Sequence, residues 1–150
     1  MSEVHQSGVP VRAYGRDWSH DWRDKARTWN RQRPDLPADR DLDRSHAYGV
    51  MAASTATLNI HGDQDGFTMR TFEAPGVGSL PLVDRAEVSE FYDVGTEALV
   101  FSGADEIIDY YQRAYVEPLW ASSIRQAGQH RTLAEHTFAH RMNALEELWT

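Results

Sequence analysis

Residues 56–84 read ATLNIHGDQDGFTMRTFEAPGVGSLPLVD, and the segment alternates apolar runs with polar ones. The runs 56–60 and 79–83 have the composition of strands. Two glycines and two aspartates within 61–66 predict a loop after the first of these strands. A short helix is expected to follow over 69–74. A strand, a loop, a helix and a second strand in this order form the repeating unit of a parallel sheet.

The rest of the chain repeats this alternation of strands and helices. Further strands are predicted over 9–14 and 97–101. Helices are predicted over 47–55, capped by Asp43 or Ser45, over 119–133 and over 137–149, with one or two helical turns over 86–92. Another helix is predicted from Ser102 or Asp105 to Tyr115, with Ile107, Tyr111 and Tyr115 on one side. The strands are short apolar runs, as expected where both faces of a sheet are buried. The sequence therefore predicts an α/β fold, a Rossmann-like domain of three layers with a short parallel sheet.

The first third of the chain differs in composition from the remainder. Residues 1–45 carry nine Lys and Arg against eight Asp and Glu, whereas residues 46–150 carry six against fifteen. Residues 17–33 mix both charges with three tryptophans, which favours a solvated irregular segment; a basic contact surface for an acidic ligand is the alternative. Two prolines predict a loop over 34–43. We expect the first strand and this irregular segment to belong to the same domain as residues 46–150.

Composition excludes several classes of protein. The chain has 150 residues, no cysteine and a formal net charge of −8. The length suits one domain, and the absence of cysteine excludes a disulfide scaffold, a Cys-ligated zinc site and a cysteine nucleophile. No apolar stretch is long enough to span a membrane, no secretory signal pattern begins the sequence, and the acidic balance disfavours nonspecific nucleic-acid binding. The expected location is the cytoplasm.

The predicted ligand site is the loop that follows the strand over 56–60. A doubly wound sheet binds its ligands at the carboxyl ends of its strands. The loop over 61–68 follows such a strand and precedes a helix, whose first N–H groups favour a phosphate. His61 directly follows the strand, and as a neutral imidazole it can donate to a phosphate or a sugar hydroxyl; the alternative is an exposed loop histidine.

The C-terminal histidines predict no metal site. His136 and His140 are four residues apart on a predicted helix, which places two ligands on one face. No third ligand has a suitable spacing, so capping and packing of the last helix is the interpretation that we favour. Trp120, Phe138 and Trp149 also fit helix packing better than a cofactor site.

An ordered series of short motifs adds a family resemblance. Its centre is Met69-Arg-Thr-Phe-Glu-Ala-Pro75, which is followed by Gly76 or Gly78 and an apolar strand. Further matches are Leu58-Asn59, Phe91-Tyr-Asp-Val-Gly95, Leu99-Val-Phe101, Ile124-Arg-Gln-Ala-Gly128 and Glu135-His-Thr-Phe-Ala-His-Arg141. Over roughly 45–150, or from Val9, the chain resembles the C-terminal, donor-binding half of GT-B glycosyltransferases. More narrowly, it is similar to the spore-maturation CgeB-type "glycosyl transferases group 1" family.

The resemblance implies roles for two acids. Many retaining GT-B enzymes carry acids spaced E-x7-E, and the matching pair here is Asp65 and Glu73. The second acid of such enzymes accepts hydrogen bonds from the ribose hydroxyls of the nucleotide, which makes Glu73 the candidate ribose ligand. The first acid contacts the donor sugar. Asp65 is one methylene shorter than the usual glutamate. Asp65 and His61 are the candidate catalytic residues.

The resemblance also implies a phosphate site at the start of the same helix. Arg70 precedes Glu73 by three residues and is expected to meet the donor diphosphate, because arginine makes bidentate contacts with phosphate oxygens. The alternative for Arg70 is a salt bridge to either acid. Thr68 and Met69 at the helix start, and Gly66 through a close approach of its backbone, complete the predicted donor site.

Together these features predict a glycosyltransferase domain that binds a nucleotide-diphosphate sugar as donor substrate. The acceptor is unknown: a glycan, a protein or a small molecule. No metal and no cofactor is expected, as the resemblance implies. The acceptor-binding domain is missing, so we expect a fold that is incomplete at its N-terminus and a partner chain that supplies the rest.

Two other functions remain open. One alternative is a non-catalytic nucleotide-binding or scaffold module with the same fold. The other is a flavodoxin-like or response-regulator-like signalling domain. The sequence disfavours the signalling domain, because it lacks an acidic cluster after the first strand and its only lysine is Lys25.

Overall fold

The computed structural model describes residues 1–29, 33, 35–62, 64–147 and 149. Its elements, in chain order, are α1 (Ser2–Gln6), β1 (Ala13–Tyr14), α2 (Trp22–Thr28), β2 (Ala38–Asp39), α3 (Arg44–Ala53), β3 (Thr57–Asn59), α4 (Arg70–Gly76), β4 (Pro81–Val83), η1 (Ala86–Glu90), β5 (Leu99–Val100), α5 (Ala104–Val116), α6 (Pro118–Glu135) and α7 (Phe138–Glu147). Parts of the predictions for the loops at Pro34 and Asp63, for residues 30–32 and for the last helix at residue 148 lie outside the described residues.

Three short parallel strands form the main sheet, in the order β3-β4-β5. Asn59, the last residue of β3, lies opposite Val83 of β4, and Val83 lies opposite Val100 of β5. The carboxyl ends of the three strands therefore lie level at one edge of the sheet. The predicted α/β fold and its short parallel sheet are confirmed.

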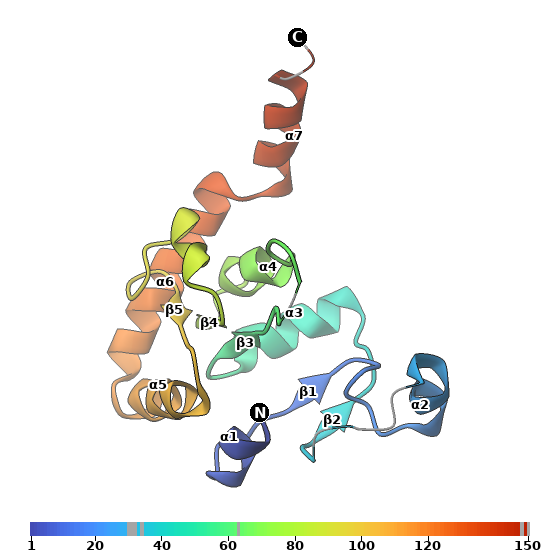
Figure 1. The fold of residues 1–150 in the computed structure, drawn as a ribbon. Helices are drawn as coiled ribbons and strands as arrows, with labels where there is room; N and C mark the ends of the chain where they lie inside the picture. The colour runs from blue at the N-terminus through green and yellow to red at the C-terminus, as the bar shows by residue number, and fades with distance from the viewer. Residues whose placement is uncertain (30–32, 34, 63, 148, 150) are drawn as a thin grey trace.

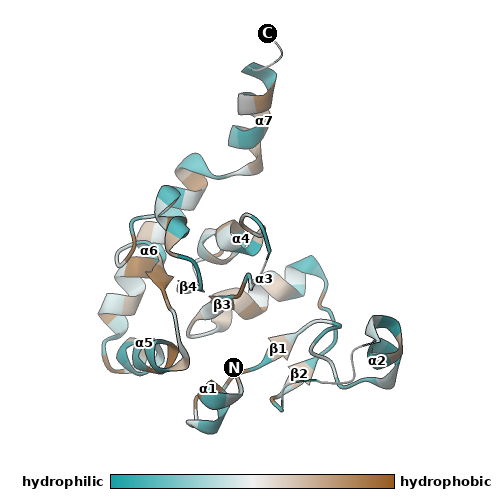
Figure 2. Cartoon of the chain, in the orientation of Figure 1, coloured by the Kyte–Doolittle hydropathy of each residue, from teal (hydrophilic) through white to brown (hydrophobic). Residues whose placement is uncertain are grey.

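The apolar core joins this sheet to its helices. Leu80, Leu82 and Ile124 are at most 2% exposed, and they belong to a cluster that connects β4 and β5 with α1, α5 and α6. α5 and α6 pack against each other, and α4 packs against α6 and β4 (Figure 1). Figure 2 shows hydrophobic residues in brown on β5, whereas the outlying α2 is largely teal. This arrangement of helices around a parallel sheet is Rossmann-like.

A second parallel pair, β1 with β2, is separate from the main sheet. The strand predicted over 9–14 therefore forms only at its end. The loop predicted over 34–43 contains β2, so that prediction is wrong in part. The reason is that proline lacks an N–H but keeps its carbonyl: the N–H of Ala13 donates to the carbonyl oxygen of Pro37 at 3.0 Å. Proline can thus border a strand without interrupting its ladder.

The segment over 17–33 is not irregular throughout, because α2 lies within it. Asp21 caps α2 by accepting the N–H of Arg23 at 2.8 Å. Asp24 on α2 is fully buried and accepts the Nε of Arg40 at 3.0 Å. This hydrogen bond from Arg40 holds the pKa of Asp24 below its ordinary value. The helix thus depends on a partner sixteen residues away, which a local pattern does not reveal.

The C-terminal helix departs from the prediction. α7 extends away from the rest of the molecule beyond the end of α6 (Figure 1). Phe138 is 67% exposed and Trp149 is 89% exposed, so the packing expected for their side chains is wrong. Tyr115, expected on one face of α5 with Ile107, is also exposed, whereas Ile107 is buried. In the described residues, no helix combines the length and the apolar character needed to cross a membrane.

Candidate functional site

The carboxyl edge of the main sheet carries a cluster of buried polar side chains. Asn59 ends β3 and His61 lies two residues beyond it, while Thr71 lies in the first turn of α4. Asn59, His61 and Thr71 are each at most 4% exposed. Buried polar groups need hydrogen-bond partners, since an unpaired one loses its bonds to water. These side chains must therefore satisfy one another.

A chain of hydrogen bonds connects this cluster to both sides of the edge. The Thr68 hydroxyl donates to Asn59 Oδ1 at 3.0 Å, and Asn59 Nδ2 donates to Thr71 Oγ1 at 2.6 Å. Thr71 Oγ1 lies 3.3 Å from His61 Nε2. His61 Nδ1 lies 2.6 Å from Asp84 Oδ1. The loop after β3, the start of α4 and the end of β4 are thus joined by side chains.

Asp84 is held as a carboxylate. Its Oδ2 accepts the backbone N–H groups of His61 at 2.8 Å and of Gly62 at 3.2 Å. Burial alone would raise the pKa of Asp84, but these bonds and the one from the His61 ring outweigh burial and hold that pKa below its ordinary value. An ionised carboxylate can only accept hydrogen bonds, so Nδ1 is the protonated nitrogen of His61.

α4 begins without a side-chain cap. Met69 is the N-cap residue and no side chain caps the helix there, because the Thr68 hydroxyl is directed to Asn59 instead. The N–H groups of residues 71–73 donate to the carbonyl oxygens of Thr68 and Met69. These three N–H groups are therefore engaged within the start of α4 and are not available to a phosphate.

The loop between β3 and α4 is fixed by one arginine. Arg85 donates to the carbonyl oxygens of Gly66 at 3.1 Å and Gly62 at 3.2 Å, and it also contacts that of Gln64. Gly66 has a φ of 71° and open space where a Cβ would lie, which is the behaviour of a turn glycine. Asp65 is exposed to solvent on this loop.

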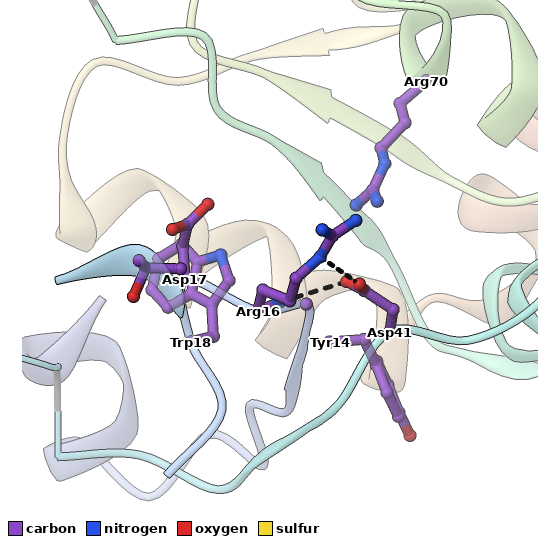
Figure 3. Close-up of a pocket in the computed structure, with 8 residues that line it drawn as sticks. Tyr14, Arg16, Asp17, Trp18, Asp41 and Arg70 are labelled. Atoms are coloured by element: carbon purple, nitrogen blue, oxygen red, sulfur yellow. Dashed lines mark hydrogen bonds and ion pairs between the residues drawn. The ribbon is translucent and has the colours of Figure 1, made fainter. Parts of the chain in front are cut away.

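Arg70 lies in a cavity that it shares with the N-terminal segment. The cavity has a volume of about 380 Å³ and is lined by Tyr14, Gly15, Arg16, Asp17, Trp18, Thr28, Asp41 and Arg70. Figure 3 shows the guanidinium groups of Arg16 and Arg70 pointing toward each other. Asp41 accepts the Nε of Arg16 at 2.6 Å and its backbone N–H at 3.1 Å. Within the part of the chain that the structure describes, Arg70 forms no ion pair, so the predicted alternative of a salt bridge to Glu73 or Asp65 is wrong.

A larger cavity of about 930 Å³ adjoins the first. Both cavities are lined by Tyr14, Arg16, Trp18, Asp41 and Arg70. Thr68 and Asn59 line only the larger one. The polar cluster at the sheet edge and the pair of arginines therefore border adjoining spaces.

Glu73 lies one turn beyond Arg70 on α4 and is half-buried. Its Oε1 accepts the hydroxyl of Tyr48, on α3, at 2.9 Å. Burial and this bond to Glu73 raise the pKa of Tyr48 above its ordinary value. Tyr48 thus fixes the orientation of the Glu73 carboxylate and leaves the second oxygen for another partner.

The structure brings together part of the predicted donor site. Thr68 and Arg70 line the larger cavity together. His61 is 3% exposed, so the alternative of an exposed loop histidine is wrong, and its ring N–H is directed to Asp84. The predicted residues that line neither cavity are His61, Asp65, Gly66, Met69 and Glu73.

Several residues at the site were not among those predicted. The main ones are Arg16 and Asp41 in the smaller cavity, Tyr48 beside Glu73, and Asn59 and Asp84 at the sheet edge. A signal for Arg16 exists in the sequence, because it lies two residues after a predicted strand and parallel strands carry ligand-binding residues at their carboxyl ends. Asp41 has no such signal, because it lies in a predicted loop. The pairing of β1 with β2 brings these two residues together. That pairing was not predicted.

The C-terminal histidines have packing and capping contacts. The His136 ring packs against Phe72 and Phe91, and its Nε2 lies 3.0 Å from the Phe91 carbonyl oxygen. His140 Nδ1 lies 2.7 Å from the Thr137 hydroxyl. Among the described residues, no three His, Asp or Glu side chains lie close enough together to hold a metal ion. The packing interpretation holds for His136, at the end of α6, whereas His140 is exposed on α7 and contacts only the start of that helix among the described residues.

Comparison with known proteins gives one match. A family model described as "Glycosyl transferase-like" matches residues 1–147, which is nearly the whole chain. No curated protein and no solved structure gives a significant match. The matched range includes the N-terminal segment with Arg16 as well as the α4 motif with Arg70.

Proposed function

The chain belongs to the glycosyl transferase-like family, and from this premise we propose that it binds the nucleotide-diphosphate sugar of a GT-B glycosyltransferase of the CgeB type. Arg16 and Arg70 hold the diphosphate of this donor, and Glu73 accepts hydrogen bonds from its ribose. The glycosyl group passes to an acceptor that is a glycan, a protein or a small molecule. A partner domain or partner chain supplies the acceptor side of the site.

The observation that carries the proposal is the pair of guanidinium groups in one cavity. Each guanidinium can donate two parallel hydrogen bonds to phosphate oxygens. Arg16 is already oriented by Asp41, so little of its conformational freedom remains to be lost on binding. Arg70 points toward Arg16 (Figure 3) and has no ion pair among the described residues that an anion would have to displace. A diphosphate carries enough negative charge to satisfy both groups.

The proposed transfer explains why fixed positive charge is needed there. The bond between the anomeric carbon and the diphosphate oxygen breaks, and its electron pair leaves with the diphosphate. A hydroxyl oxygen of the acceptor forms the new bond to the anomeric carbon and releases its proton. Negative charge therefore grows on the diphosphate, where oriented guanidinium groups stabilise it. In this proposal the two arginines stabilise the negative charge of the leaving diphosphate in place of a divalent cation.

The ribose role of Glu73 follows from its place on α4. Residues three apart on a helix are neighbours on its surface, so Glu73 lies beside Arg70 on α4, although it lines neither cavity. Its carboxylate keeps one oxygen on the Tyr48 hydroxyl, and the other can accept from a vicinal pair of ribose hydroxyls. Asp65 on the exposed loop is the remaining candidate for contact with the donor sugar.

Calorimetric titration of the full chain with UDP, GDP and TDP tests the proposal. Arg16→Ala and Arg70→Ala should each weaken binding of the preferred diphosphate by about 10- to 100-fold, as expected for the loss of charge-assisted hydrogen bonds. Arg70→Lys keeps the charge but loses the bidentate geometry, so its affinity should lie between those of the wild type and Arg70→Ala. Arg113→Ala is the matched control, because Arg113, on α5, pairs with Glu117 just beyond that helix and lines neither cavity. Absence of binding to all three nucleotides would overturn the proposal.

A second candidate function is nucleotide binding without transfer. It is favoured by one observation, namely that His61 is buried and Asp65 lines neither cavity. Release of UDP from UDP-glucose, followed by chromatography with and without candidate acceptors, separates the two functions. Tight binding without any release of UDP supports the module, and release that depends on Arg70 supports the enzyme.

A further inference from the structure

We propose that Thr68 faces its ligand as a hydrogen-bond acceptor, and that Asp84 sets this polarity through His61 and Asn59. The proposal rests on the proposed function for its ligand, a nucleotide sugar, whose sugar hydroxyls are hydrogen-bond donors. Thr68 is then a residue that determines specificity at the sugar. Asp84, His61 and Asn59 are positioning residues, which act on the ligand through Thr68.

The polarity originates at Asp84. Its Oδ2 accepts two backbone N–H groups, and its Oδ1 lies 2.6 Å from His61 Nδ1. A carboxylate offers no hydrogen, so the hydrogen between Asp84 and His61 is on Nδ1. In the proposed network this is the only ring proton, so Nε2 carries a lone pair, which requires donors around it.

This lone pair orients the amide of Asn59. Asn59 Nδ2 lies 3.4 Å and Thr71 Oγ1 lies 3.3 Å from His61 Nε2. If the amide were turned over, its oxygen would face the lone pair at that distance, and two acceptors would oppose each other inside a buried cluster. The NH2 group therefore faces His61 and Thr71, and the oxygen Oδ1 faces Thr68.

The last step assigns the hydroxyl of Thr68. Because Oδ1 of Asn59 can only accept, Thr68 donates its single hydrogen to it at 3.0 Å. Only lone pairs then remain toward the larger cavity, which Thr68 lines together with Arg70. Phosphate oxygens are acceptors and gain nothing from this group, whereas a sugar hydroxyl can donate to it. The site is thus divided between arginines for the phosphates and Thr68 for the sugar.

The tautomer of His61 tests the origin of the polarity without any ligand. Nitrogen-15 NMR of the full chain should show His61 neutral and protonated on Nδ1. In Asp84→Asn, the amide oxygen can keep the backbone N–H groups while its NH2 faces Nδ1. The proton should then move to Nε2 and the Asn59 amide should turn over, so that Thr68 accepts from Asn59 Nδ2 and donates its hydrogen toward the cavity instead. Protonation of Nε2 in the wild type, or an unchanged tautomer in a folded Asp84→Asn chain, would overturn the proposal.

Binding of UDP-glucose tests the role of Thr68. Thr68→Val keeps the shape without the hydroxyl and should weaken binding by about 2- to 10-fold, the range for one net hydrogen bond. Thr68→Ser is the matched control and should bind like the wild type, whereas Asp84→Asn, which reverses the polarity of the Thr68 hydroxyl toward the cavity, should weaken binding. Equal affinities of Thr68→Val and wild type would overturn the role of Thr68. If the wild type binds neither UDP nor UDP-glucose, the proposed function fails, and the tautomer of His61 still decides the polarity.

Discussion

Replacing Gly128 with alanine should destabilise the protein, although alanine favours helices more than glycine does. Gly128 lies inside α6 and is buried. A Cβ at this position would lie 2.4 Å from the carbonyl oxygen of Glu97 and 3.5 Å from Pro75 Cβ. Real Cβ contacts are essentially never shorter than 3.0 Å, so α6 and the chain at Glu97 must move apart.

The magnitude follows from what can move. Insertion of a methyl group into a packed core costs about 1–3 kcal/mol. The obstacle here is a backbone carbonyl, and Arg131, one turn along α6, holds the same Glu97 through two oxygens at 3.1 Å each, which favours the upper end. The higher helix propensity of alanine offsets about 1 kcal/mol of this cost. The free energy of unfolding should therefore fall by about 2 kcal/mol, which corresponds to a Tm lower by about 4–8 °C in a chain of this size.

Urea unfolding followed by circular dichroism measures the change, with Gly49→Ala as the control. Gly49 lies inside α3, is exposed and has no atom within 4 Å of a Cβ position, so its replacement should stabilise the chain by up to about 1 kcal/mol. The two variants make the same chemical change in two helices and should shift the urea midpoint in opposite directions. A Gly128→Ala variant as stable as the wild type would refute the close approach of α6 to Glu97.

Three further predictions concern single side chains. Tyr48→Phe removes the hydrogen bond that orients Glu73 and should weaken UDP binding by about 2- to 10-fold in calorimetry; unchanged affinity would contradict the ribose role. Asp24→Asn removes the ion pair of a fully buried carboxylate with Arg40 and should lower the Tm in a thermal scan, whereas an equal Tm would contradict the structural role of that pair. The pKa of Asp84 is lower in the folded than in the unfolded chain, so the ionised carboxylate stabilises the fold fully above the unfolded pKa, and this stabilisation is lost as the pH falls through the folded pKa. Asp84→Asn should therefore reduce the decline of the urea midpoint between about pH 5 and pH 2. An identical decline in the wild type and the variant would exclude this contribution.

The elements of the main sheet could be predicted because their signals are local. The apolar runs before and after the loop at 61–66 are bounded by turn residues, and Pro118 marks the start of α6 as expected for a first helical position. Asp43 caps α3 by accepting the His46 N–H at 3.0 Å, as the sequence indicated. Signals of this kind depend on a few neighbouring residues and need no knowledge of the tertiary fold.

The remaining parts depend on partners distant in the sequence. α2 was missed because its buried Asp24 needs Arg40, and β2 because its partner β1 is more than twenty residues away. The apolar spacing of α7 predicted a helix correctly, but spacing alone does not say whether another element covers that face. In the site, Arg70 was named from its motif, whereas the pairing of Arg16 with Asp41 required the knowledge that β1 and β2 end together. Long-range pairing is the information that a single sequence lacks.

Arg70 and the buried polar cluster at the sheet edge both depend on how firmly α4 is held. At its start, Thr71 is tied to Asn59 and lies against His61. At its end, the Gly76 carbonyl oxygen accepts the Gln129 amide at 3.2 Å, and α4 packs against α6.

A helix of seven residues is only about 10 Å long, so contacts at both ends leave it little freedom to tilt. Arg70 projects from this element toward the cavity it shares with Arg16. Because α4 is held at both ends before a ligand arrives, the proposed diphosphate would meet Arg70 on a fixed helix, beside an Arg16 side chain that Asp41 already orients. This preorganisation lowers the entropy cost of binding, and it connects the buried cluster around His61 to a ligand that the cluster does not touch.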